Sequence, residues 1–268
     1  MYIPDGESWT RWLHEIRQIE LVGAMKCVSL GQDSTVLELG CGDGFQLGLL
    51  RERFGRVFAI DPEAFLDPGG GFVKSMAEAL PFPDRLFDLV ISSNVSEHLN
   101  DRRCAMEEVR RVLRPGGYAV HIVPTRIWKL ASLALNPVGY PLRVVEKWYA
   151  RRRLRRDVIA AGRALPNGLP SPGVLQVLGR CFYPPIHGTF PSHLAEYRSY
   201  TRQQWVQTFA IPGFTFIAEV PLFFYTQFGL CRFCFVPARQ WAARHGMASS
   251  RAFILQKATG CTNSRTSR

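Results

Sequence analysis

Short apolar runs alternate with amphipathic segments along the first half of the chain. Runs rich in β-branched and aliphatic residues predict buried strands at 35–39, 57–61, 86–93 and 118–123. Between them, apolar side chains recur at helical spacing, as over 45–54 and 101–113. This alternation over residues 34–123 is typical of an α/β protein whose parallel sheet is covered by helices.

The alternation stops after residue 123 and returns near the C-terminus. A helix is expected over 201–209, a strand over 213–220 and another over 251–257. We therefore divide the chain into a helical N-terminal segment (1–33), a ligand-binding core (34–123), an inserted cap (124–200), a core helix with strand six (201–220), a second insertion (221–250), and a last strand with a flexible tail (251–268).

The first predicted strand ends in a glycine-rich turn. Gly40 and Gly42 let the backbone approach a ligand without a Cβ in the way, and Gly44 lets the next helix pack against the strand. Glu38 precedes these glycines inside the strand, which disfavours a dinucleotide-binding turn. Asp61 ends the second strand, where a carboxylate can accept hydrogen bonds from both hydroxyls of a ribose. The turn therefore predicts a nucleoside-containing ligand.

Five motifs follow one another in the order found in class I S-adenosylmethionine-dependent methyltransferases, and the chain resembles that family. The motifs are residues 38–44, Asp61, residues 79–84 leading into Phe87-Asp88, residues 97–99, and residues 110–117. The resemblance covers 34–123, with a weaker echo near the C-terminus. It implies a Rossmann-like mixed sheet of seven strands, six parallel and one antiparallel, with helices on both faces. It also implies S-adenosyl-L-methionine as the cofactor.

The resemblance also implies which residues contact the cofactor. Glu38, Gly40 and Gly42 would frame its amino acid end, and Asp61 would hold its ribose. The full predicted set is Glu38, Gly40, Cys41, Gly42, Gly44, Asp61, Pro62, Met76, Ala77 and Asn94.

One predicted cofactor position departs from the family pattern. Met76 stands where the family usually has an aspartate for the adenine amino group. We expect Met76 to pack on the face of the base, while the amide of Ala77 serves a ring nitrogen and Pro62 covers the other side. Binding is therefore expected, with weaker affinity than an aspartate would confer.

Methyl transfer from a sulfonium is an in-line displacement, so the protein mainly has to align the reacting atoms. A hydroxyl acceptor also needs a base. His98, just beyond the fourth strand, is the candidate, and a locally hydrogen-bonded helix-start residue is the alternative. Residues 186–200 hold two histidines, a glutamate and two tyrosines that could line the acceptor pocket, with His193 or Glu196 as an alternative base. The other interpretation is a loop that is only packed over the core. In quinone O-methyltransferases of this superfamily a Glu-x-x-Glu-His stretch binds a divalent metal, but Asn94 replaces the first carboxylate here, so no metal is predicted.

Charge is divided unevenly between the two halves of the chain. Residues 1–120 hold 13 Lys and Arg and 18 Asp and Glu, whereas residues 121–268 hold 20 and 4. Five arginines over 151–156 follow an apolar, aromatic segment over 128–149. That combination is typical of an anionic membrane surface element and equally of a cap helix with a solvated flank. Nucleic acid is disfavoured, because the arginines are interleaved with apolar residues.

The remaining features bound the protein class. Pro137 and Pro141 interrupt one of the longest apolar stretches, so no membrane-spanning helix is expected. The first residues lack the order of a signal peptide, and the seven cysteines are scattered, so we expect a cytoplasmic enzyme, either free of the membrane or peripheral to it. The predicted reaction is O-methylation of a small-molecule, glycan or lipid-linked acceptor. The alternatives are an RNA or protein methyltransferase, or a non-catalytic cofactor-binding protein.

Overall fold

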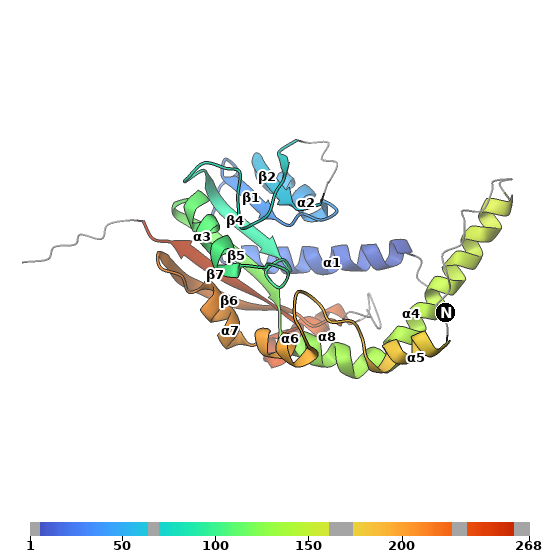
Figure 1. The fold of residues 1–268 in the computed structure, drawn as a ribbon. Coiled ribbons are helices and arrows are strands. Elements are labelled where there is room, and N and C mark those ends of the chain that lie inside the picture. Colours follow the sequence, from blue (N-terminus) through green and yellow to red (C-terminus); the bar gives the residue numbers. More distant parts are fainter. Residues whose placement is uncertain (1–5, 64–69, 161–173, 227–234, 260–268) are drawn as a thin grey trace, which may run out of the picture.

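The computed structural model describes residues 6–63, 70–160, 174–226 and 235–259 (Figure 1). Parts of the predicted tail (260–268) and second insertion (227–234) lie outside the described residues. The strands are β1 (Thr35–Leu39), β2 (Arg56–Asp61), β3 (Phe72–Lys74), β4 (Phe87–Ser93), β5 (Leu113–Pro124), β6 (Phe214–Phe223) and β7 (Ser250–Lys257). The helices are α1 (Gly6–Met25), α2 (Phe45–Arg53), α3 (Arg102–Val112), α4 (Arg126–Ala160), α5 (Val174–Phe182), α6 (His193–Ser199), α7 (Arg202–Phe209) and α8 (Val236–Ala242), followed by the π-helical turn η1 (Ala243–Met247).

All seven strands form one sheet in the order β3-β2-β1-β4-β5-β7-β6. Strand β7 pairs antiparallel with both β5 and β6, and every other pair is parallel. The predicted sheet of six parallel strands and one antiparallel strand is confirmed. The carboxyl ends of β1, β2 and β4 therefore meet at one edge, where sheets of this type bind their ligands.

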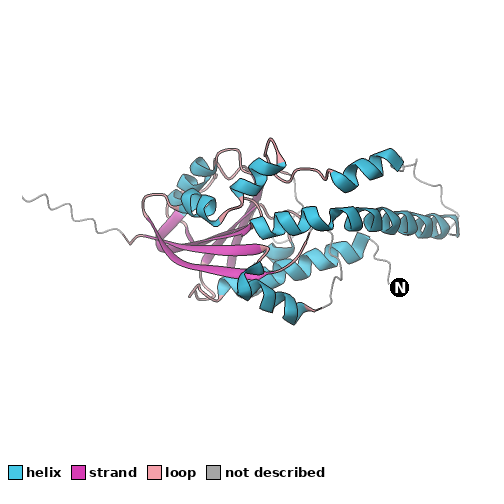
Figure 2. Ribbon diagram, turned by 90° about the horizontal axis from the view of Figure 1, so that it is seen from below, coloured by secondary structure: helices cyan, strands magenta, loops and turns pink. Residues whose placement is uncertain are grey.

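Helices cover both faces of the sheet because the strand side chains alternate in direction (Figure 2). One face packs against α3 and α7 through Leu37, Val90 and Phe253. The other packs against α1 and α2 through Val36, Ile91 and Ile254. All six of these strand side chains are at most 2 % exposed, as expected for strands buried on both sides.

Two strands are longer than the apolar pattern predicted. Strand β5 begins at Leu113, which pairs with Phe87, and the register then shifts so that Tyr118 pairs with Leu89. Residues 114–117, which include Gly116 and Gly117, form this irregularity. Strand β6 continues past residue 220, because Pro221 and Phe223 still pair with β7. Pairing partners supplied by the sheet, rather than local propensity, set these strand ends.

Helix α4 runs without a break through Pro137 and Pro141, the two prolines that interrupt its apolar sequence. Pro137 is exposed, so water can reach the carbonyl group that its ring deprives of a backbone hydrogen bond. The helix extends beyond the sheet into solvent, and α5 lies beside it (Figures 1 and 2). None of the helices in the described part of the chain carries an apolar stretch long enough to cross a bilayer.

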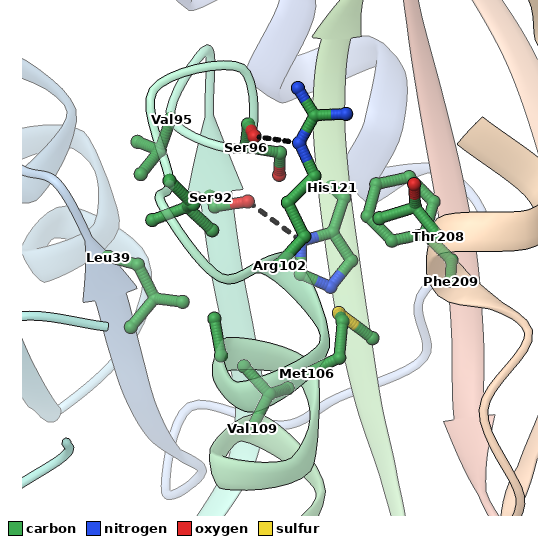
Figure 3. A pocket seen from close by; sticks show the side chains of 12 residues that line it. Leu39, Ser92, Val95, Ser96, Arg102, Met106, Val109, His121, Thr208 and Phe209 are labelled. Carbon is green, nitrogen blue, oxygen red and sulfur yellow. Dashed lines mark hydrogen bonds between the residues drawn. The ribbon is translucent and has the colours of Figure 1, made fainter. Parts of the chain in front are cut away.

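His121 is buried in the sheet beside a small cavity under α3 and α7 (Figure 3). Its Nδ1 lies 2.8 Å from Ser92 Oγ, and its ring stacks on Phe209 at 4.6 Å between centroids. Burial lowers the pKa of His121 to about 3. The cavity has space for about one water molecule. It is therefore a feature of the core and not a substrate site.

His121→Asn should make the protein less sensitive to acid. The unfolded chain protonates His121 below pH of about 6.5 while the folded chain does not until about pH 3, so the free energy of unfolding falls as pH drops across that window, by at most about 1.4 kcal/mol per pH unit. Asparagine keeps a partner for Ser92 but does not titrate. Urea unfolding at several pH values measures the slope, and the exposed His245→Asn variant is the control. An unchanged slope in His121→Asn would contradict the assignment.

Candidate functional site

The glycine turn after β1 is built from backbone that only glycine adopts readily. Gly40, Gly42 and Gly44 have φ values of 69°, 53° and 80°. The amides of Gly40 and Cys41 both donate to the carbonyl of Ile60, at 2.8 and 3.2 Å. These bonds tie the turn to the end of β2, so the predicted ligand edge is formed jointly by β1 and β2.

Gly40 also meets the loop after β4. A Cβ on Gly40 would lie 2.4 Å from Val95 Cγ2, closer than any real contact of this kind. The loop that carries Asn94 and His98 therefore lies directly against the turn. This contact joins the predicted cofactor residues to the predicted base.

Helix α1 holds the turn from outside, a contact that the sequence analysis did not find. His14 Nε2 and Asp43 Oδ2 are 2.7 Å apart, and the His14 ring stacks on Phe45 at 3.9 Å. Although burial works to raise the pKa of Asp43, its hydrogen bonds with His14 and with the Phe45 amide hold that pKa below the usual value. Nothing in the local spacing relates His14 to Asp43, since the contact depends on how α1 packs.

Two carboxylates stand at this edge. Glu38 is 3 % exposed, and its Oε2 has no hydrogen-bond partner. Burial raises the pKa of Glu38 to about 8, and the negative charge of Asp43 adds to the rise. Asp61 accepts hydrogen bonds from the amides of Gly42 and Glu63, at 3.0 and 2.9 Å. An unsatisfied buried carboxylate beside open glycine backbone fits a ligand that carries a positive charge.

The predicted adenine contacts lie next to Asp61. The Ser75 amide donates to the Asp61 carbonyl at 3.1 Å, which places Met76 beside the ribose candidate. Met76 is 45 % exposed, whereas Ala77 is buried. Pro62, which follows Asp61, is also exposed. An exposed thioether at this edge is compatible with stacking on a base, and the roles of all three residues stay predictions.

Asn94 occupies the turn that leaves β4, with a φ of 54°. Its amide donates to the Ile122 carbonyl at 2.8 Å, and its Nδ2 donates to Ser93 Oγ at 3.3 Å. The side chain therefore stands at the same edge as Glu38 and Asp61, since β4 is the neighbour of β1.

Glu97, His98 and His187 form a cluster beyond β4. His187 belongs to the stretch 186–200 that was expected to line the acceptor pocket, but its contact with Glu97 was not predicted. Glu97 is fully buried, neither of its carboxylate oxygens has a hydrogen-bond partner, and His187 Nε2 is 3.8 Å from Oε1. The rings of His98 and His187 are 4.8 Å apart. Each of the three residues offers an atom for a metal, all within 4.8 Å of one another. The expectation that no metal is used stays a prediction.

Burial lowers the pKa of His98, the charge of Glu97 opposes this, and the neighbouring His187 adds to the lowering. The net result is a ring that is neutral at pH 7. A neutral imidazole at the ligand edge can accept a proton, as a general base must.

His193 lies in a different set of contacts. Lys129 of α4 forms a buried ion pair with Glu196 of α6, and Lys129 Nζ is 2.8 Å from His193 Nδ1. Glu196 also accepts from the His187 amide at 3.3 Å. The Nδ1 atom of His193 therefore contacts Lys129, whereas His187 contacts His98. Among the described contacts, His193 is connected to the cluster of Glu97, His98 and His187 only through Glu196. Its role as an alternative base stays a prediction.

The insertion and the core approach each other closely at one glycine. Gly188 has a φ of 80°, and a Cβ there would lie 2.7 Å from the Glu97 carbonyl oxygen. Because only glycine fits, the loop that carries His187 can pack directly against Glu97. Sequence reasoning could not find this pairing, since 187 and 97 are far apart along the chain.

Comparison with known proteins identifies the segment that forms this edge. Residues 37–121 match the family described as a methyltransferase domain. Residues 37–121 form a methyltransferase domain. An uncharacterized methyltransferase of Mycobacterium sp. (strain KMS) is 38% identical over 93 residues, 32% of this chain and 37% of the relative.

A second relative matches over a longer segment of this chain. A probable S-adenosylmethionine-dependent methyltransferase of Mycolicibacterium smegmatis is 35% identical over 132 residues, 47% of this chain and 49% of the relative. The chain thus matches between about a third and a half of the length of these relatives. The predicted methyltransferase family is confirmed for residues 37–121, and S-adenosylmethionine is the cofactor named for the second relative.

Solved structures share the fold over nearly the whole chain. The S-adenosylmethionine-dependent methyltransferase of Mesorhizobium loti has a TM-score of 0.53 and 14% identity, over 89% of this chain and 98% of its own. A Haloferax volcanii methyltransferase, solved with its Trm112 activator, gives 0.52 and 14%, over 96% and 100%. These likenesses confirm the fold.

Gly40→Ala should destabilise the methyltransferase domain by about 2 kcal/mol or more. Its φ penalises any side chain by roughly 1–2 kcal/mol, and the new methyl group overlaps Val95. Gly48→Ala in α2 is the matched control, because nothing lies within 4 Å of its Cβ and alanine favours a helix by up to about 1 kcal/mol. Urea unfolding compares the two variants. Equal stability of Gly40→Ala and the unmodified protein would refute the close contact with the loop after β4.

Proposed function

We propose that the chain transfers a methyl group from S-adenosylmethionine to an oxygen atom of a small-molecule, glycan or lipid-linked acceptor. One observation carries the proposal. Glu38, Asp61 and the loop bearing His98 stand at the carboxyl ends of the adjacent strands β1, β2 and β4. A charged cofactor site and a base for the acceptor thus lie on one edge.

The donor set at the turn fits the cofactor. The unsatisfied Oε2 of Glu38 suits the positive charges of S-adenosylmethionine, and Asp61 suits its ribose. When bound, the cofactor supplies a methyl group on a positively charged sulfur, which leaves as a neutral thioether. The open backbone at Gly42, where a Cβ would meet nothing within 4 Å, lets the cofactor lie along the chain.

His98 provides the acid–base chemistry in this proposal. Its lowered pKa keeps the ring neutral near pH 7, so it removes the proton of the acceptor hydroxyl as the oxygen–methyl bond forms and the sulfur–methyl bond breaks. The buried charge of Glu97 then stabilises the protonated ring. His187, held beside His98, lines the acceptor side of the site.

Asp61→Ala should weaken S-adenosylmethionine binding by about tenfold or more, because a hydrogen bond to a charged group contributes roughly 1.5–3 kcal/mol. Calorimetric titration measures the affinity. Asp84→Ala is the control, since Asp84 is 69 % exposed and pairs with Arg111 away from the turn. Thermal unfolding of both variants establishes that they are folded. Equal affinities in the two variants, or no binding by the unmodified protein, would refute the assigned cofactor site.

His98→Gln should slow methyl transfer by roughly 10² to 10⁴-fold while cofactor affinity is nearly unchanged. In the unmodified protein the rate should rise with pH to a plateau, with a midpoint below 6.5, because the pKa of His98 is lowered. The assay follows labelled methyl groups from the cofactor into glycan and lipid fractions.

A chelator should leave the rate of methyl transfer by the unmodified protein unchanged. Loss of activity with chelator would instead make Glu97, His98 and His187 a metal site.

A further inference from the structure

One face of α4 is apolar and exposed along most of its length. We call it the apolar stripe, and it consists of Leu130, Ala134, Val138, Leu142, Val145, Trp148 and Tyr149. The six larger side chains are each between 41 % and 58 % exposed. At 3.6 residues per turn the seven positions fall within an arc of about 120° and span about 29 Å. Single exposed apolar residues are ordinary, but a continuous stripe marks an interaction surface.

The opposite face of α4 is already occupied. Lys129, Ser132 and Asn136 are buried, and they project roughly opposite the stripe. Asn136 Nδ2 donates to the carbonyl oxygens of Arg180 and Cys181 in α5, both at 2.6 Å. The described part of α5 therefore fixes the polar face of α4 and leaves the stripe pointing away from it.

Charge selects the kind of partner. Helix α4 contains nine lysines and arginines and two acidic residues, five of the arginines lying over 151–156, just past the stripe. At that end Arg152 lies over the ring of Trp148, at 4.3 Å, and Trp148 contacts Tyr149 edge-on at 4.9 Å. Tryptophan and tyrosine beside arginine suit the boundary between lipid tails and anionic headgroups.

A second copy of the chain fits the stripe less well. Pairing two stripes would bring together two helices that each carry this excess of positive charge, and like charges repel at close range. An anionic bilayer has the opposite charge, accepts the whole apolar length and needs no shape match.

We propose that the apolar stripe of α4 docks the protein on the surface of an anionic lipid bilayer, with the helix lying in the plane of the interface. The same helix carries Lys129, whose partner Glu196 holds the His187 backbone. Docking therefore fixes the acceptor side of the site near the membrane. The inference from docking to the acceptor rests on the proposed function. It assigns a hydroxyl group of a lipid or lipid-linked molecule as the acceptor class.

The test is cosedimentation of the full chain with vesicles. One set is phosphatidylcholine alone, and in the other phosphatidylglycerol replaces about a third of it. The test variant is Leu142→Ser, Val145→Ser and Trp148→Ser combined. The matched control is Val22→Ser, Ile217→Ser and Trp241→Ser combined, which removes two aliphatic side chains and one tryptophan of similar exposure outside α4.

We expect binding to the anionic vesicles only, weakened by salt, and reduced by about tenfold or more in the stripe variant but not in the control. Absence of binding to anionic vesicles at low salt, or equal loss in both variants, would overturn the proposal. So would a dimer in sedimentation velocity that the stripe variant abolishes, because the stripe would then join two copies. Titration with S-adenosylmethionine in both variants reports separately on the proposed function.

Discussion

A buried ion pair between Lys129 of α4 and Glu196 of α6 holds the two ends of the insertion against each other. Both side chains are nearly inaccessible to solvent, and breaking such a pair by removing one partner typically costs about 3–5 kcal/mol. Glu196 also receives the His187 amide, so the pair sets where the insertion meets Glu97 and His98. The cofactor edge depends on the sheet and on the contact of α1 with the glycine turn, whereas the acceptor side depends on this pair within the insertion.

The methyltransferase core could be predicted from the sequence because its determinants are local. A strand, a glycine turn and a helix occupy 35–53 without interruption, and Asp61 follows at the next strand end. The positive φ of Gly40, Gly42 and Gly44 is what the spacing of the glycines indicated. The seven-stranded sheet was implied by the resemblance to methyltransferases, because the crossover rule fixes the handedness of each βαβ unit and not the strand order.

The remainder could not be predicted, because it depends on packing between distant segments. His14 reaches Asp43 only through the position of α1, and His187 reaches Glu97 only through the insertion. Helix α4 also depends on a distant contact. Proline disfavours a helix interior, yet the helix continues through Pro137, and its polar side is held by α5 through Asn136. Tertiary contacts outweighed propensity in each case.

The contact between Gly188 and Glu97 also constrains how the acceptor side can be altered. The loop with His187 lies close to the backbone after β4, since a Cβ on Gly188 would be 2.7 Å from the Glu97 carbonyl oxygen. An insertion with a different loop here would collide with that backbone or fall short of it. A new insertion therefore requires a matching loop after β4, and because Val95 of that loop packs on Gly40, the change extends to the glycine turn.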